Sequence, residues 1–316
     1  MSGVSSRFYC SELSRRAEEK TFGTASIGAL WILLEYPHGW GRHALEDSAL
    51  SPQVKNFFQT TLARVRHSRL LFVKTDRGRR DARMNLFVVR CRERAPSVVR
   101  FGLEKYDDVT AIDFAALAAA DPGALAAVAD AQGGVVTGEP LFLVCTHGKR
   151  DKCCAKFGIS LYNSLRRAAG ESVWQSSHVG GDRFAANLLC FPHGLFYAHV
   201  GEEAGRRAVE EYREGRMVLD KFRGRACYSH QAQAAEFFVR AAAGLNAVEA
   251  LRFRSSERAG GDSWRVQFTE AASGRVHEAR VARRLSDFQN FITCHSTEQR
   301  PVAQFHLEDY GVTAGE

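Results

Sequence analysis

The chain lacks long apolar segments. Its longest apolar run, residues 27–34, is far shorter than the roughly 20 residues that a membrane-spanning helix needs, so no membrane span is predicted. The first twenty residues mix serine, arginine, cysteine and glutamate, and they contain neither an apolar core nor a small-residue cleavage site. A secretory signal is therefore not expected, and the prediction is a cytoplasmic location.

The chain also lacks a C-x-x-C motif, the usual arrangement for thiol–disulfide exchange. Eight cysteines are nevertheless present, and in a cytoplasmic chain they indicate free thiols, metal ligands or redox residues rather than a disulfide framework. Only Cys145, Cys153 and Cys154 lie close together in the sequence. The isolated cysteines are interpreted as small buried apolar residues: Cys10, Cys91, Cys190, Cys227 and Cys294.

The composition is that of ordinary globular domains. Hydrophobic residues make up 45% of the chain and charged residues 25%, and a length of 316 residues allows two or three cores. The net charge is +7, but basic and acidic residues alternate along most of the chain, so nucleic-acid binding is not expected. One basic turn around Gly78 is interpreted as a solvated loop, with contact to an acidic partner or a phosphate as the alternative. Its arginines are Arg77, Arg79, Arg80 and Arg83.

The periodicity of apolar residues predicts an α/β fold in which one order of elements occurs twice. In the first half, a strand at residues 30–36 precedes a helix that begins after Ser51, a typical N-cap followed by Pro52. Three further strands and an alanine-rich helix follow at residues 70–73, 86–91, 98–103 and 111–120.

The second half repeats this β-α-β-β-β-α order. Its predicted elements lie at residues 141–145, 156–168, 173–176, 187–191, 195–200 and 202–214. The similarity of residues 33–43 to residues 143–153 indicates a possible duplication, with chance similarity as the alternative. We therefore predict domains at residues 1–137, 138–216 and 217–316, the last a small α+β region with a helix after Ser229 and a hairpin that turns at Gly274.

Residues suited to metal binding gather in the second half. Cys145 ends a predicted strand, and Cys153 and Cys154 begin the next helix, so a strand-loop-helix turn brings soft thiolates together. Such a pair suits zinc, copper or an iron–sulfur cluster, and reactive thiol chemistry is the alternative. Downstream, His178 and Asp182 flank two glycines, which permit a tight bend that points both side chains to one place.

These segments resemble a known family. The motifs that carry the resemblance are CTHGKRDKCC at residues 145–154, WQSSHVGGDRFA at 174–185 and PHGLFY at 192–197. They resemble the sucrase/ferredoxin-like family of thioredoxin-like 2Fe-2S proteins, most strongly over residues 141–200. The resemblance extends more weakly over residues 10–230 and implies two thioredoxin-like halves. No carboxylate pair supports glycoside hydrolysis, despite the family name.

The resemblance implies a ligand set. Cys145, Cys154 and His178 match the family's positions, whereas Asp182 stands where members with two histidine ligands have the second histidine. The fourth ligand is therefore expected to be Asp182, Cys153 or solvent, in that order. Fewer thiolates leave the cluster less negative and easier to reduce than a cluster with four cysteines, so an intermediate, pH-dependent potential is expected.

Neighbouring residues and partners follow from this ligand set. Backbone N–H groups of Gly180 and Gly181 are expected to donate to the cluster, and Lys149, Arg150 and Arg183 to offset its charge and meet an acidic donor. His147 is a further possible ligand. The main hypothesis is an electron carrier between a reductase and an unidentified acceptor rather than an enzyme with its own substrate; a thiol–disulfide oxidoreductase and a zinc-binding or apo scaffold are the alternatives.

Overall fold

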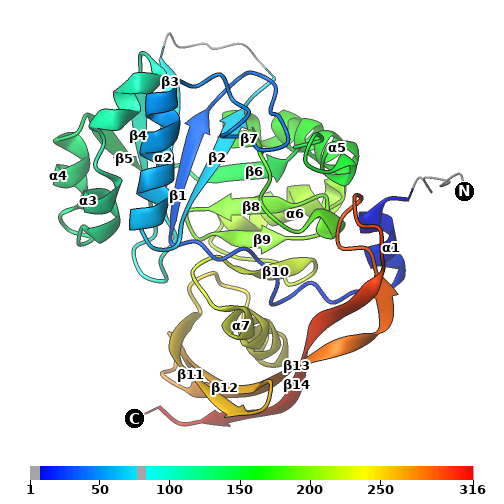
Figure 1. The fold of residues 1–316 in the computed structure, drawn as a ribbon. Helices are drawn as coiled ribbons and strands as arrows, with labels where there is room; N and C mark the ends of the chain where they lie inside the picture. Colours follow the sequence, from blue (N-terminus) through cyan, green and yellow to red (C-terminus); the bar gives the residue numbers. More distant parts are fainter. Residues whose placement is uncertain (1–7, 77–82, 316) are drawn as a thin grey trace, which may run out of the picture.

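The computed structural model describes residues 8–76 and 83–315 (Figure 1). Three arginines of the predicted basic turn, Arg77, Arg79 and Arg80, lie outside these residues. The elements of the first half are as follows: α1 (Cys10–Arg16), β1 (Leu30–Glu35), α2 (Pro52–Arg64), β2 (Ser68–Lys74), β3 (Met84–Arg90), β4 (Ser97–Leu103), α3 (Phe114–Ala119), α4 (Leu125–Asp130) and β5 (Gly134–Thr137).

The second half and the C-terminal region continue this mixed α/β arrangement. Their elements are β6 (Leu141–Cys145), α5 (Lys152–Ala169), β7 (Val173–Ser176), β8 (Leu188–Phe191), β9 (Leu195–Tyr197), α6 (Glu202–Arg213), β10 (Phe222–Arg225), α7 (His230–Ala243), β11 (Leu251–Gly260), β12 (Ser263–Glu270), β13 (Val276–Asn290) and β14 (Arg300–Thr313).

One ten-stranded sheet runs through both halves in the order β10-β9-β8-β6-β7-β2-β1-β3-β4-β5. In the first half, β1 pairs with β2 in parallel and with β3 antiparallel. In the second half, β6 pairs in the same way with β7 and β8. The halves meet at an antiparallel pairing of β2 with β7, so the strand order of one half mirrors that of the other across this junction.

The two half-sheets share an apolar core on the sides that their helices leave uncovered. Ile32 of β1 packs in the cluster under α2, whereas its neighbour Trp31 lies in a different cluster with Leu143 and Cys145 of β6. Phe142 of β6 points the other way, into the cluster under α5 and α6. Figure 1 shows the strands of the two halves crossing steeply. The helices thus lie outside, and the end of β6 borders the central core.

The C-terminal region adds β10 to the edge of the large sheet and then forms a separate antiparallel sheet in the order β11-β12-β13-β14. Helix α7 packs on this sheet, with Val239 of α7 in one apolar cluster with Val266 and Phe268 of β12. The long β13–β14 hairpin continues beyond β12, and its tip, residues 291–299, lies beside α1 (Figure 1). Helix α1 and the hairpin tip therefore meet near the start of α5.

Several predicted boundaries were wrong, for identifiable reasons. Helix α5 begins at Lys152 rather than near residue 156, because the Asp151 side chain caps it by accepting from the Cys153 backbone N–H at 2.8 Å. The helix predicted at residues 111–120 is shorter, because Asp113 caps the backbone N–H groups of Ala115 and Ala116 and α3 covers only Phe114–Ala119; a 3-10 turn (Tyr106–Ala111) precedes it. Among the described helices, none is long and apolar enough to cross a membrane.

Candidate metal centre

Cys145, Cys154 and His178 meet at one buried place. Cys145 is the last residue of β6, Cys154 lies in the first turn of α5, and His178 follows β7. Their ligand atoms all lie within 4.8 Å of one another. Both cysteines are buried, while the His178 side chain is 20% exposed. The three residues that the sequence singled out are thus brought together by the ends of two neighbouring strands and one helix.

The start of α5 is held close to the end of β6 by a glycine. A Cβ on Gly158 would lie 2.0 Å from the carbonyl oxygen of Cys145, which is far inside van der Waals contact. Only a glycine therefore lets the helix approach the strand this closely. This approach sets the separation of Cys154 from Cys145.

The glycine bend predicted between His178 and Asp182 is present. Gly180 and Gly181 have φ values of +90° and +81°, which favour glycine, and their α-carbons face Ser26 and Arg223. Asp182 places its Oδ1 3.2 Å from the Nδ1 of His178 and 3.8 Å from the sulfur of Cys154. A buried carboxylate therefore lies beside the Cys154 thiol and the imidazole.

The four groups perturb one another's protonation. A hydrogen bond from Cys154, aided by His178, lowers the pKa of Cys145 well below its usual value although burial opposes this, while the same contact and burial raise the pKa of Cys154. Burial raises the pKa of Asp182. Burial also lowers the pKa of His178, but the Cys145 hydrogen bond and nearby negative charge outweigh it, and the pKa of His178 is raised. These opposite shifts favour a thiolate at Cys145 beside a protonated thiol at Cys154.

One ligand candidate is left without a hydrogen bond. The Nδ1 atom of His178 is buried, and although Asp182 lies near it, no hydrogen bond to it forms in the part of the chain that the structure describes. A buried polar atom without a partner is costly, and binding to a metal would satisfy it. Thiolate sulfur, imidazole nitrogen and carboxylate oxygen are the donor set of zinc and iron sites. The residues therefore fit a metal or an iron–sulfur cluster.

His147 forms a hydrogen bond through each of its two ring nitrogens and so positions the loop that carries His178. Its Nδ1 accepts from the backbone N–H of His178 at 3.1 Å, and its Nε2 therefore donates to the Gly41 carbonyl oxygen at 2.6 Å. Burial lowers the pKa of His147, which keeps the ring neutral as this pairing requires. The ring therefore joins a loop of the first half to the ligand loop of the second half.

Arg223 is a buried cation behind the glycine bend that the sequence reasoning missed. It donates to the carbonyl oxygens of Gly180 and Thr24, at 3.1 and 2.6 Å, and to the side-chain oxygen of Asn187 at 2.7 Å. Burial lowers its pKa to about 9. The β10 segment, Phe-Arg-Gly-Arg, contains two arginines and is not apolar, so no local pattern marks Arg223 as buried; its acceptors become visible only in the fold.

The other basic residues predicted near the site take different places. Lys149 is exposed on the ligand loop, and Arg150 is half-buried beside it. Arg183 donates to the buried Glu19 at 2.6 Å, so its charge is already paired with a carboxylate of the N-terminal segment. Arg150 is thus the one of the three that faces the cavity next to His178.

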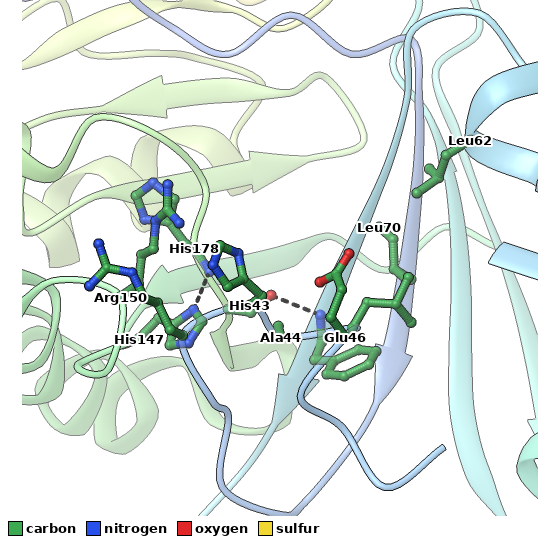
Figure 2. A pocket seen from close by; sticks show the side chains of 12 residues that line it. His43, Ala44, Glu46, Leu62, Leu70, His147, Arg150 and His178 are labelled. Carbon is green, nitrogen blue, oxygen red and sulfur yellow. Dashed lines mark hydrogen bonds between the residues drawn. The ribbon is translucent and has the colours of Figure 1, made fainter. Parts of the chain in front are cut away.

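An open cavity of about 270 Å³ leads to this centre (Figure 2). Figure 2 shows His147 and His178 joined by their hydrogen bond, with Arg150 beside them. The opposite wall holds Glu46, Leu62 and Leu70, and the remaining wall residues are Arg42, His43, Ala44, Leu45, Phe72 and Ser177. The cavity therefore reaches the imidazole side of the site rather than the two thiols.

Cys153 does not face this centre. Although it neighbours Cys154 in sequence, its sulfur lies 3.6 Å from that of Cys10 and 3.3 Å from that of Cys294. Cys10 and Cys294, interpreted from the sequence as isolated apolar residues, are thus part of a second group of thiols. Asp182 is left as the protein group beside Cys145, Cys154 and His178.

The fold and site together define an α/β protein with a buried thiol, imidazole and carboxylate group. The sequence model of the sucrase/ferredoxin-like family matches residues 21–224, well over half of the chain, and the protein belongs to this family. The match ends within β10, so it leaves out α1, α7 and the four-stranded sheet.

One curated relative is similar to part of the chain. A stretch of 97 residues is 29% identical to "Altered inheritance of mitochondria protein 32" of Meyerozyma guilliermondii, covering 27% of the chain and 34% of that protein. The match thus spans about a third of the relative's length. No solved structure matches the chain.

Proposed function

We propose that the protein carries electrons by means of a 2Fe-2S cluster held by Cys145, Cys154, His178 and Asp182. The observation that carries this proposal is the convergence of two thiols and an imidazole nitrogen at one buried place, with the Asp182 carboxylate next to the imidazole and to the Cys154 thiol. When bound, such a cluster takes up and returns one electron at a time. Family membership supports the proposal, since the matched region contains all four residues.

The residues around the ligands would set the behaviour of the site. Two thiolates, one imidazole and one carboxylate bring less negative charge than four thiolates, which favours a potential above that of all-cysteine clusters. Apolar packing around Cys145 and Cys154 excludes water. The His178 side chain lines the cavity beside Arg150 and is the most exposed of the four ligands. An acidic reductase or acceptor would therefore approach from the side of Arg150.

We also infer that the two halves of the large sheet arose by duplication of a thioredoxin-like unit. The supporting observation is that each half has a central strand with one parallel and one antiparallel neighbour, followed by a further antiparallel strand. In this view only the second half holds ligands, because residues 33–43 of the first half contain no cysteine. The first half then contributes the loop that hydrogen-bonds His147.

A single zinc ion is the competing occupant, because the three atoms of Cys145, Cys154 and His178 lie close enough to bind one ion. Thiol exchange with a protein substrate through Cys153 and Cys154 is disfavoured, since both are 0% exposed. Iron and acid-labile sulfide therefore separate the two metal hypotheses directly.

The test is elemental analysis of anaerobically purified protein. We expect about two iron and two sulfide per chain, and a paramagnetic signal after one-electron reduction. Cys145→Ala and Cys154→Ala should each lose the iron, while Cys190→Ala, which removes an equally buried thiol elsewhere, should keep it. Colourless wild-type protein that holds zinc at these residues would refute the proposal.

A further inference from the structure

A second group of potential ligands lies on the other side of the α5 start. It consists of Cys10 of α1, Asp151 and Cys153 at the start of α5, and Cys294 at the tip of the β13–β14 hairpin. The ligand atoms of these four residues lie within 4.8 Å of one another. The residues come from both ends and the middle of the chain, and Cys10 and Cys294 lie outside the region that the family shares.

The three sulfurs form a nearly regular triangle. The Sγ–Sγ distances are 3.6 Å between Cys10 and Cys153, 3.3 Å between Cys153 and Cys294, and 3.5 Å between Cys294 and Cys10. Zn–S bonds of about 2.3 Å at tetrahedral angles separate the sulfurs by roughly 3.8 Å. A disulfide would instead join two sulfurs at about 2.05 Å and leave the third apart. The triangle therefore has nearly the dimensions of a single tetrahedral ion.

Asp151 completes the group as a buried carboxylate. It is 0% exposed, and its Oδ2 lies 4.0 Å from the Cys10 sulfur. Its two oxygens accept from the backbone N–H groups of Cys153 and Cys294, at 2.8 and 2.7 Å, which fixes the carboxylate against both segments. No lysine or arginine among residues 8–76 and 83–315 forms an ion pair with it. A buried carboxylate beside three thiols favours a bound cation.

We propose that Cys10, Asp151, Cys153 and Cys294 bind one zinc ion as a structural site. Three soft thiolates and one carboxylate fill the four positions of a tetrahedral ion and leave none open for a substrate, as in structural rather than catalytic zinc sites; three of the four residues are buried and Cys294 is partly exposed. Backbone N–H groups donate hydrogen bonds to two of the four ligands. The backbone N–H of Cys10 donates to the Cys294 sulfur at 3.4 Å, and Asp151 accepts two such bonds.

The site would couple the C-terminal region to the first centre. Cys153 and Cys154 are neighbours in the first turn of α5, so an ion that fixes Cys153 also fixes the helix turn that presents Cys154. The ion would at the same time tie α1 and the hairpin tip to the large sheet. The zinc site would then position Cys154, a ligand of the other centre. It does not itself need to exchange electrons.

The first experiment measures the zinc content of the full-length chain. It uses a variant whose first centre cannot bind metal. In the double variant Cys145→Ala/Cys154→Ala, purified under reducing conditions, we expect about one zinc per chain. Adding Cys10→Ala or Cys294→Ala should bring this to about zero, whereas adding Cys227→Ala should leave it unchanged. Zinc that is absent from the double variant, or unaffected by loss of Cys10 and Cys294, would overturn the proposal.

Cobalt substitution gives a readout that does not depend on stability. Chelator-treated double variant titrated with Co²⁺ should develop the thiolate charge-transfer and visible bands of a tetrahedral site at one equivalent, and zinc should displace them. A Cys153–Cys294 or Cys10–Cys153 disulfide, found by mass spectrometry in protein purified under reducing conditions, would contradict the inference. Failure of the iron analysis above would leave these outcomes unchanged, so the two proposals fail separately.

Discussion

Two groups of potential metal ligands lie on opposite sides of one helix start, and the chain builds them in different ways. Cys145, Cys154, His178 and Asp182 come from a single stretch of residues 145–182 and border the core between the half-sheets. The second group joins Cys10, the α5 start and Cys294, which are separated by 141 to 284 positions. The first centre therefore depends on one supersecondary unit, and the second on the docking of α1 and the hairpin tip.

This difference has an energetic consequence. Closing a loop of more than a hundred residues costs more conformational entropy than closing one of about ten, so the second group needs other interactions to hold its segments together. The Arg183–Glu19 pair and the hydrogen bonds of Asp151 supply some of them. We expect perturbations of α5 to affect both groups, perturbations of the glycine bend to affect the first, and perturbations of α1 to affect the second.

The largest effect should come from Gly158→Ala, which acts on the shared helix. Glycine to alanine within a helix usually stabilises by up to about 1 kcal/mol. Here the new Cβ would lie 2.0 Å from the Cys145 carbonyl oxygen, and we expect the free energy of unfolding to fall by more than about 3 kcal/mol. Urea unfolding measures this change, and metal analysis should show loss of both iron and zinc.

Ile159→Ala is the matched control for this prediction. Ile159 is the next residue of α5 but is 46% exposed, so its truncation should change the free energy of unfolding by less than about 1 kcal/mol and leave both metals bound. If Gly158→Ala proved as stable as the wild type, the close approach of α5 to β6 would not set the geometry of either group.

The same contrast explains what the sequence could predict. Strand ends, a helix start and two glycines within 38 positions brought the region of Cys145, Cys154, His178 and Asp182 to attention, and the family resemblance implied the ligand set, including Cys154 rather than Cys153. The order of elements in both halves followed from apolar periodicity in the same way. The placement of each of these residues depends on local geometry, which the sequence encodes over short distances.

The second group could not be predicted, because nothing near Cys10 or Cys294 indicates the other. Its formation depends on the β13–β14 hairpin, whose outer strand β14 was not recognised, and on α1, for which no helix was predicted. The docking of these elements is a tertiary property. Arg223 was missed for a related reason, since its acceptors lie on Thr24, Gly180 and Asn187, far away in the sequence.

An intermediate effect, confined to the first centre, should follow from Arg223→Met. The substitution leaves the carbonyl oxygens of Gly180 and Thr24 and the Asn187 side chain without their buried donor, which should cost about 2–3 kcal/mol of unfolding free energy. Since the glycine bend presents His178 and Asp182, iron should be lost while zinc remains.

Arg216→Met provides the comparison, because Arg216 has a 40% exposed side chain and pairs with Glu211 and Glu214 outside the site. We expect a change within about 0.5–1 kcal/mol and full content of both metals. If Arg223→Met lost zinc together with iron, the two ligand groups would not form independently of each other, contrary to what the fold indicates.

The smallest effect concerns the docking of α1 and depends on pH. His199 places its Nε2 3.2 Å from the hydroxyl of Ser14 and its Nδ1 3.4 Å from that of Ser11, both on α1. Burial, aided by Arg15, lowers the pKa of His199 from 6.5 to about 3. The imidazole of His199 therefore binds a proton near pH 6.5 in the unfolded chain but only near pH 3 in the folded chain. The free energy of unfolding falls as the pH decreases through this window.

Between pH 7 and pH 5 this single group should lower the free energy of unfolding by about 1–2 kcal/mol, after allowance for the partial exposure of the ring. His199→Gln removes the titration but can keep one hydrogen bond to α1, so the difference between its pH dependence and that of the wild type isolates the contribution of His199. Urea unfolding of metal-free protein at both pH values measures it. If the wild type and His199→Gln showed the same dependence of unfolding free energy on pH, His199 would not be held neutral in the folded protein. The docking of α1, on which the second group depends, would then not require a neutral His199.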